Sequence, residues 1–336
     1  MEKYGWQYNI SGDKSNLKME VIPHKDKMKQ LPETLFKIYS LNSNSIDALL
    51  NSYIYGSHPS EFNDLFDCHK DLIEWDANFV YDLILIYYNN DKCLFKFSDF
   101  SQDFHLNKIK YVNVAYQILY RTFGIYCMSE NIKNATIWAN YCKNNGFALE
   151  FDIEHLKSDL ERNNYKPFGP FQINYQESIE KIQLNKGKFE AILYQTNIKD
   201  INWKYEHEWR LLIESKPDTP LEIPLVEFEK MGVSEKECMK FKAEKRKFNI
   251  TNDSIRSIRL SLDFFKNEEL RIVIANDTEF IINLKDGNKI CVLNFIYEHS
   301  IDLYLSVPDN QRFQINFKKY MIEKIKINEF KLIKIK

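Results

Sequence analysis

Glycine and proline are scarce in this sequence, with nine of each among 336 residues. Disordered and low-complexity chains are usually rich in these residues, so the composition argues against both classes. Hydrophobic residues make up 44% of the chain and aromatic residues 15%, which is ample material for a buried core. A chain of this length predicts one large domain or a domain with an appendage.

Neither sign of charge predominates in the sequence. The 46 lysines and arginines nearly balance the 48 aspartates and glutamates, which gives a formal net charge of −2. The molecule as a whole therefore has no field that would draw it to nucleic acid, although a local basic patch is not excluded.

Cysteine pairs and long apolar runs are missing as well. None of the six cysteines forms a C-x-x-C pair or lies at zinc-ligand spacing from a histidine. Scattered reduced thiols of this kind are typical of a cytoplasmic protein. The N-terminal residues contain no apolar signal core, and no apolar run approaches the ~20 residues that span a bilayer. We therefore expect a cytoplasmic protein with no membrane partner and no metal.

The common catalytic signatures are absent too. The sequence contains no Walker loop, G-x-G-x-x-G, H-E-x-x-H or G-x-S-x-G. Nucleotide hydrolysis by a P-loop, zincin proteolysis and α/β-hydrolase chemistry thus lose their usual support.

Apolar patterns predict an α+β fold with a mixed or antiparallel β core and helices mainly in the N-terminal half. Residues 1–32 read as a loosely held lead-in, 33–285 as the main domain, and 286–336 as a strand-rich extension that either finishes the main sheet or forms an appendage. Asp286-Gly287 predicts a hairpin turn, and Gly146 is expected to end a helix. Helices are expected over 71–89, 106–122 and 234–248, and the lysine-rich tail 324–336 resembles a protected edge strand.

The stretch Y-E-H-E-W-R places Glu206, Glu208 and Arg210 at every second position. In a strand these three charges would share one face, while Trp209 and Leu211 would face the core. Such a face could be a catalytic ridge. It could equally be a solvated ladder of charges worth only ~0.2–1 kcal/mol per pair.

Other polar and aromatic residues could belong to the same site. Asn63 and Asp64 lie in the loop S-E-F-N-D, where they could form a turn or contact a substrate. Ser129 ends an expected strand and could cap the next helix. Trp138 and Tyr141, three residues apart, share a helix face and could be core residues or could stack on a planar ring.

Three blocks resemble the bacterial family of unknown function DUF2971. They are the strand followed by "SEFND", then "CMSE…IWANYCKNNGFALEFD", and then "WKYEHEWR", and the resemblance covers residues 33 to about 275. The chain departs from the family pattern at Leu65, where proline is more frequent, at Ile137, where methionine is usual, and at Ser261 and Leu262, near a usual glycine. The family name implies no activity.

The order of residue types is also similar to that of ADP-ribosyltransferases, which have a polar residue on an early strand, a serine or tyrosine on a middle strand and a glutamate, often in E-x-E, on a late strand. This similarity implies a split sheet and NAD as the cofactor that is consumed. On this analogy Lys37 contacts the cofactor's phosphates or amide, Ser129 takes the middle-strand place, and Glu206 and Glu208 take the late-strand place.

The same analogy implies a role for each residue. Glu208 would be the catalytic carboxylate that stabilises positive charge developing on the ribose, and Glu206 would activate the acceptor. Arg210 would anchor a phosphate or keep Glu208 ionised. Trp138 or Tyr141 would sandwich the nicotinamide ring.

The first hypothesis is therefore an NAD-dependent ADP-ribosyltransferase-like enzyme, a toxin or defence effector that modifies a nucleic acid or a protein. If water is the acceptor, the enzyme is an NAD glycohydrolase. A non-catalytic binding or sensor module of a defence system is the alternative. These two differ in whether the charged face lines a pocket with Lys37 and Ser129 or faces solvent. A metal-dependent nuclease is a further alternative, and it would use a carboxylate cluster made of Asp64, Asp67, Glu206 and Glu208. The sequence does not define the oligomeric state.

Overall fold

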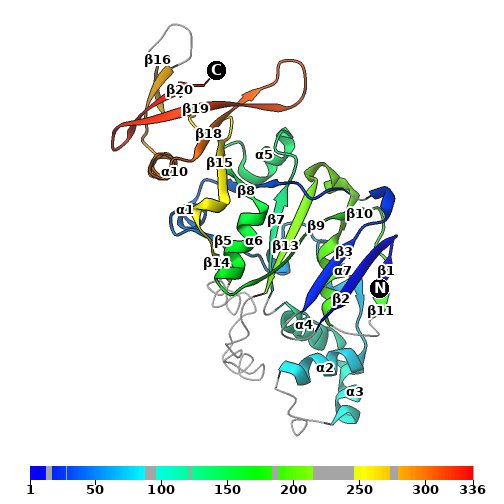
Figure 1. Ribbon diagram of the computed structural model, residues 1–336. Helices are drawn as coiled ribbons and strands as arrows, with labels where there is room; N and C mark the ends of the chain where they lie inside the picture. Colours follow the sequence, from blue (N-terminus) through cyan, green and yellow to red (C-terminus); the bar gives the residue numbers. More distant parts are fainter. Residues whose placement is uncertain are drawn as a thin grey trace.

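The computed structural model describes residues 1–12, 17–27, 29–87, 96–120, 123–183, 188–214, 246–272 and 279–335. A large mixed sheet with helices packed against it forms the body of the molecule (Figure 1), which confirms the α+β class. Most of the charged helix expected at 234–248 lies outside the described residues. Within the described part of the chain, no helix is long and apolar enough to cross a membrane.

The large sheet has the strand order β16-β17-β20-β19-β18-β15-β8-β4-β7-β13-β9. Neighbouring strands run antiparallel except β15 and β18, which are parallel. The strands of this sheet are β4 (Thr34–Ser40), β7 (Phe123–Ser129), β8 (Gly146–Asp152), β9 (Lys166–Gln172), β13 (Glu208–Glu214), β15 (Ile255–Leu260), β16 (Glu269–Ile272), β17 (Glu279–Asn283), β18 (Asp302–Pro308), β19 (Ile315–Lys326) and β20 (Glu329–Lys334).

Helices and smaller strands surround this sheet. The α-helices are α1 (Ser43–Leu50), α2 (Ala77–Tyr87), α3 (Phe97–Leu106), α4 (Lys108–Leu119), α5 (Ala135–Cys142), α6 (Ile153–Arg162), α7 (Lys188–Asn197) and α10 (Gly287–Glu298). The smaller strands are β1 (Glu2–Lys3), β2 (Trp6–Ser11), β3 (Lys18–Ile22), β5 (Tyr53–Tyr55), β6 (Ile73–Glu74), β10 (Asn174–Gln176), β11 (Ile182–Gln183), β12 (Ile198–Asp200) and β14 (Lys247–Asn249). The helices expected over 71–89 and 106–122 correspond to the shorter α2 and α4.

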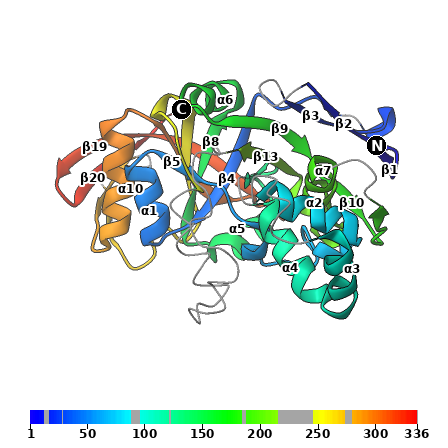
Figure 2. The same cartoon turned by 90° about the horizontal axis from the view of Figure 1, so that it is seen from below.

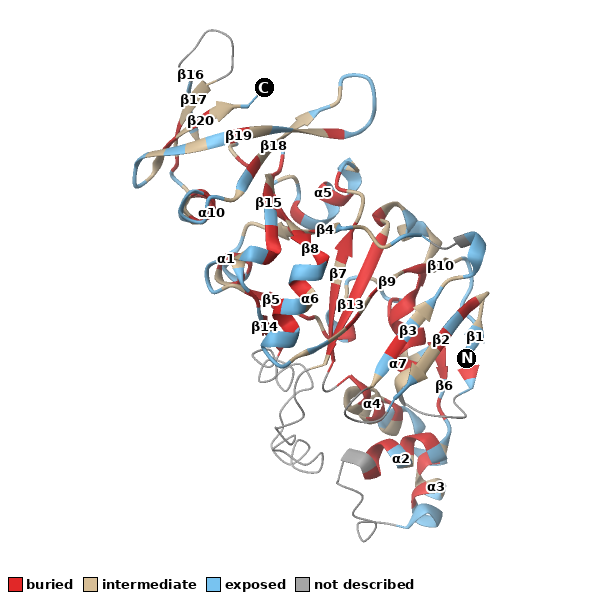
Figure 3. Cartoon of the chain, viewed as in Figure 1, coloured by how far each residue is buried: buried red, intermediate tan, exposed pale blue. Residues whose placement is uncertain are grey.

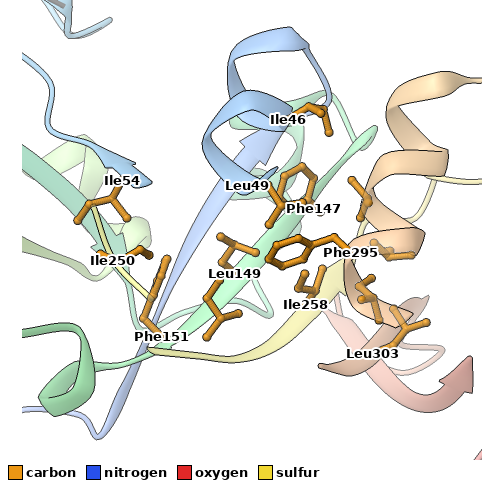
Figure 4. Close-up of a cluster of buried hydrophobic side chains, with 14 of the residues drawn as sticks. Ile46, Leu49, Ile54, Phe147, Leu149, Phe151, Ile250, Ile258, Phe295 and Leu303 are labelled. Carbon is orange, nitrogen blue, oxygen red and sulfur yellow. The ribbon is translucent and has the colours of Figure 1, made fainter. Parts of the chain in front are cut away.

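The sheet separates two large hydrophobic clusters, so its central strands are buried on both faces (Figure 3). On β13, Leu211 and Ile213 join the cluster that also contains residues of α1, α6 and α10 (Figure 4), whereas Leu212 joins the cluster beneath α2, α4 and α7. The helices α1 and α10 lie side by side over the first cluster (Figure 2). A strand with two buried faces must have a paired partner for every polar side chain that it carries.

The Asp286-Gly287 hairpin prediction is wrong. The side chain of Asp286 accepts a hydrogen bond from the Asn288 backbone N–H and caps the first turn of α10. The residues after it bury Val292, Leu293 and Ile296 at helical spacing. An aspartate is a strong helix cap as well as a turn residue, and here the helical period of the following apolar residues decides between the two.

Gly146 does not end helix α5, as expected, but begins strand β8. The helix ends at Lys143, which adopts the left-handed conformation with φ 49°. A Cβ atom at position 146 would come within 2.1 Å of the Tyr39 carbonyl oxygen on β4. Close contact between two paired strands, rather than a helix end, therefore explains the glycine.

The tail does not form an edge strand. β20 lies between β17 and β19, and β19 lies between β20 and β18, so both tail strands are internal. The register pairs β20 with β17, which lies before residue 285, and thus one sheet contains residues from both sides of that position.

The described part of residues 1–32 is not loosely held. Strands β1, β2 and β3 form a three-stranded sheet that packs on β9 and α7. Trp6, Tyr8 and Met19 retain only 2%, 1% and 4% of their exposure. Tyr4, Ile10, Leu17 and Val21 pack against the same cluster, and the lysines between these scattered apolar residues conceal the pattern in the sequence.

The sheet has one weak junction near its centre. β4 pairs with β8 at seven positions but with β7 at one position, Phe36 opposite Ser129. We call this junction the β4–β7 seam. Across it the hydroxyls of Tyr39 and Tyr126 lie 2.7 Å apart.

Candidate functional site

The three charges of Y-E-H-E-W-R do not all lie on one strand. Asp200 caps a 3₁₀-helix, η4 (Ile201–Glu206), through a side-chain bond with the Asn202 N–H. His207 then takes a left-handed conformation with φ 46°, and β13 begins only at Glu208. The expected alternation holds for Glu208 and Arg210 and is wrong for Glu206, which ends the preceding helix.

All three charges are buried. Glu206, Glu208 and Arg210 retain 3%, 4% and 0% of their exposure. The solvated charge ladder is therefore excluded, because each of these groups lost its hydration on folding and needs partners inside the protein.

Arg210 is held entirely by protein groups. Its Nε donates to Glu208 at 2.7 Å, and its two terminal nitrogens donate to the Asp67 carboxylate at 2.8 and 2.5 Å. Further bonds reach the Thr196 carbonyl at 3.0 Å and the second Glu208 oxygen at 3.3 Å. Its five N–H groups are thus used, and Arg210 keeps Glu208 ionised rather than presenting a free fork to a phosphate.

Lys199, on β12, was not predicted and lies at the centre of the site. Its Nζ donates to Glu206 and to Glu208 at 2.7 Å each, and Asp67 lies at 3.7 Å. On another side the Trp203 ring centroid is 5.1 Å away. No sequence pattern marks Lys199, and Asp67 was expected only as a metal ligand in the nuclease alternative. The fold brings β12 and the loop after η2 (Pro59–Glu61) to β13.

The two glutamates have opposite electrostatic surroundings. Burial by itself would raise the pKa of Glu208, but the charges of Arg210 and Lys199 outweigh it and hold that pKa well below its usual range. For Glu206, burial raises the pKa above the ordinary value, and the negative charge of Glu208 adds to this although Lys199 opposes it. Two adjacent carboxyl groups whose pKa values are pushed apart are the usual arrangement of an acid–base pair.

A small pocket of about 40 Å³ opens beside these carboxylates. Its walls come from β4, β7, α5, η4 and β13. It brings together Lys37, Ser129, Tyr141, Glu206 and Glu208, five of the residues that the sequence predicted. A volume of this size holds one or two water molecules, so a larger ligand requires a side chain to move.

Lys37 and Ser129 line the pocket in different ways. Among the described residues the Lys37 side chain makes no hydrogen bond or ion pair, and its Nζ lies 5.3 Å from the Tyr126 ring centroid. The Ser129 hydroxyl donates to the Glu206 carbonyl at 2.5 Å and accepts from the Asn131 N–H at 2.9 Å. Ser129 thus fixes the end of η4, and helix α5 is capped by Asn134 instead.

Tyr141 and Trp138, both on helix α5, have different environments. The Tyr141 hydroxyl donates to Glu206 at 2.6 Å, and the side chain is 36% exposed at the pocket. Trp138 is 0% exposed, and its indole N–H donates to the Ile132 carbonyl at 2.8 Å. Trp138 is a core residue and offers no ring face to a ligand, so its expected stacking role does not fit its position.

Asn63 and Asp64 remain in a surface loop and do not line the pocket. Asp64 accepts a hydrogen bond from the Phe66 N–H at 3.0 Å, which is the turn-forming role. The loop continues to Asp67, and it is this third residue that reaches the buried cluster.

The carboxylates do not form a metal cage within the described residues, where no group of three or more metal-ligating side chains is suitably placed. Asp67, Glu206 and Glu208 converge, but they converge on the ammonium of Lys199. The cation that balances their charge therefore belongs to the protein, and the donor set does not favour the nuclease hypothesis.

Residues 137–211 match a family model described as "Protein of unknown function (DUF2971)". The resemblance expected from the three sequence blocks is thus confirmed over these residues. The match begins in α5, ends in β13 and includes five residues of the site: Tyr141, Lys199, Glu206, Glu208 and Arg210. No curated protein and no solved structure matches the chain.

Proposed function

We propose that the chain is an NAD-dependent ADP-ribosyltransferase-like enzyme that transfers ADP-ribose to a macromolecular acceptor, a nucleic acid or a protein, as a toxin or defence effector in the cytoplasm. One observation carries the proposal. Lys37, Ser129, Tyr141, Glu206 and Glu208 come from separate segments and line a single pocket, as this hypothesis required, instead of facing solvent.

The two carboxylates suit the two halves of the reaction. The bond between the ribose C1′ and nicotinamide breaks, and nicotinamide leaves with the bonding electrons. Glu208, ionised by Arg210 and Lys199, would stabilise the positive charge that develops on the ribose. Glu206 would accept the proton of the acceptor nucleophile as the new bond to C1′ forms, because its raised pKa suits a general base.

The side chains that line the pocket suit NAD chemically, but the pocket is smaller than the nicotinamide ring. Lys37 supplies a cation without a carboxylate partner among the described residues, which suits the phosphates or amide of the cofactor. The volume of about 40 Å³ is too small for a nicotinamide ring. Tyr141 forms part of the pocket wall, is 36% exposed, and its hydroxyl donates a hydrogen bond to Glu206. Outward rotation of this side chain would enlarge the pocket. The β4–β7 seam supports the expected split of the sheet.

Nicotinamide release from NAD by the purified chain, alone and with cell extract as a source of acceptors, tests the proposal. We expect Glu208→Gln to lower the rate about 10²–10³-fold, as the loss of one electrostatic stabiliser does. Glu206→Gln should slow transfer to an acceptor by about 10²–10⁴-fold. The matched control is Glu154→Gln on α6, whose carboxylate is 81% exposed and which should retain the full rate.

Each alternative result has a clear meaning. If the natural sequence releases no nicotinamide under any of these conditions, the enzyme proposal is wrong and the pocket belongs to a binding or sensor module. If Glu208→Gln and Glu206→Gln retain the full rate, NAD is cleaved at another site.

A further inference from the structure

We infer that Lys199 is a positioning residue that sets the charge states of the two pocket carboxylates, so that Glu208 stays ionised while Glu206 exchanges the proton. The catalytic consequence rests on the proposed function, whereas the effect of Lys199 on the carboxylates does not. No sequence pattern marks this lysine.

Lys199 bridges the carboxylates of Glu206 and Glu208. One buried ammonium group donates to both Glu206 and Glu208 at 2.7 Å, and Asp67 lies at 3.7 Å. The Trp203 ring covers another side of the ammonium group at 5.1 Å from its centroid. Three carboxylates and an aromatic face all favour the charged form of the amine, and these carboxylates raise its pKa despite its burial.

The charge count shows why Glu206 is the group that responds. Asp67, Glu206 and Glu208 carry three negative charges when ionised, against the positive charges of Lys199 and Arg210. The cluster therefore has one carboxylate too many. Arg210 bonds Glu208 and Asp67 directly, so Glu206 is the carboxylate of the three that is left to bind a proton.

In the described part of the chain, Lys199 is the one cation that contacts the Glu206 carboxylate. Within the described residues the other side-chain partner of Glu206 is the Tyr141 hydroxyl at 2.6 Å. The titratable and charged groups around it, from every element packed there, are Lys37 on β4, Asp67 in its loop, Cys127 on β7, Tyr141 on α5, Tyr175 on β10, Lys199 on β12, Tyr205 on η4, and Glu208 and Arg210 on β13. Of these described groups, only Lys199 forms an ion pair with Glu206.

The test is a pH titration of the Glu206 carboxyl carbon by ¹³C NMR in the ligand-free protein, with Glu206→Gln to assign the signal. We expect Lys199→Met to raise the Glu206 midpoint by about 1 to 3 pH units, because an opposite charge in contact is lost. Lys199→Arg keeps the charge and should raise it less. Lys285→Met, which removes a lysine from an exposed ion pair with Glu269, is the control and should change nothing.

A second variant covers the case in which Lys199→Met does not fold. In Lys199→Met/Glu208→Gln one cation and one carboxylate are removed together, so the excess of one carboxylate is restored and the Glu206 midpoint should return close to that of the natural sequence. The inference is wrong if the midpoint is unchanged in Lys199→Met, or if it stays displaced in the double variant.

The activity readout separates this inference from the proposed function. If nicotinamide is released, its pH–rate profile in Lys199→Met should move by the same amount as the carboxyl midpoint. A moved midpoint with no nicotinamide release from any variant overturns the enzyme proposal and leaves the role of Lys199 intact. A profile that does not move, while the midpoint does, overturns the catalytic consequence.

Discussion

At the scale of single residues, the site is a buried cluster in which each charge depends on the others. Lys199 contacts three carboxylates and Arg210 contacts two of them, so removing either cation leaves buried carboxylates without a partner charge. An uncompensated buried charge costs more than the pair contributes. The two cations and Glu208 are therefore expected to be important for folding, independently of any reaction.

Stability measurements can separate the two glutamates without any substrate. We expect Glu208→Gln to destabilise the protein at neutral pH by about 3–5 kcal/mol, because it breaks a buried pair with Arg210. Glu206→Gln should cost much less, since the neutral side chain matches the state that burial favours. Denaturant unfolding of both variants and the natural sequence between pH 4 and pH 8 provides the measurement.

The sign of the pH dependence follows from the two pKa directions. Because the folded pKa of Glu208 lies below its ordinary value of 4.5, its contribution is present above that value and is lost as pH falls below it. Because the folded pKa of Glu206 lies above 4.5, its contribution is present below that value and is lost as pH rises through the raised pKa. Equal losses in the two variants at neutral pH would contradict this assignment.

Local sequence could identify some of these residues and not others. Glu208 and Arg210 obey the strand period, and Tyr141 stands on a helix face that the pattern marks, so they were predicted. Lys199 carries no local signal, and Asp67 was named only in the carboxylate cluster of the nuclease alternative, because the contacts of both residues arise only when distant segments fold together. Trp138 was misassigned since an aromatic pair at helical spacing reads the same whether it packs in the core or lines a pocket.

At the scale of the elements, caps and close contacts decide the boundaries. β7 ends at Ser129, as expected, because its residues form a continuous apolar pattern. The structure departs from the expectation where a residue has two common uses: Asp286 caps a helix instead of forming a hairpin, and Gly146 admits a neighbouring strand instead of ending a helix. A short-range pattern does not distinguish these uses.

The capping role of Asp286 can be measured directly. Asp286→Ala should destabilise the protein by about 1 kcal/mol, because the Asn288 N–H loses its acceptor at the start of α10. Asp286→Asn retains a side-chain acceptor and should cost only a few tenths of that. Thermal unfolding of the two variants compares them, and equal loss in both would point to the charge of Asp286 and away from its hydrogen bond.

At the scale of the whole molecule, the strands after residue 285 are part of the same sheet and core as those before it. Phe330 and Leu332 of β20 belong to the hydrophobic cluster that also contains Trp209 and Leu211 of β13. The sequence left open whether this region finishes the sheet or stands apart, because a strand pattern does not name the strand's partners. Pairing of β20 with β17 and of β18 with β15 joins the two parts.

This continuity predicts cooperative unfolding. Phe330→Ala should destabilise the protein by about 3–5 kcal/mol, since it empties a fully buried site. The loss should be seen equally by far-ultraviolet circular dichroism and by tryptophan fluorescence, although all five tryptophans lie before residue 210. The control is Phe313→Ala, whose ring is fully exposed and should be nearly silent. A fluorescence transition that does not move would mean that the C-terminal strands unfold separately.

The β4–β7 seam has a mechanical consequence. Backbone hydrogen bonds are directional and make a sheet stiff along its ladders, whereas apolar packing has no preferred direction and tolerates small rotations. One backbone pair joins β4 to β7, so the sheet is most compliant along the line where the pocket lies. A load applied across the sheet would deform the walls of the pocket before it deformed the strands on either side. The candidate site therefore lies at the part of the sheet that deforms most easily.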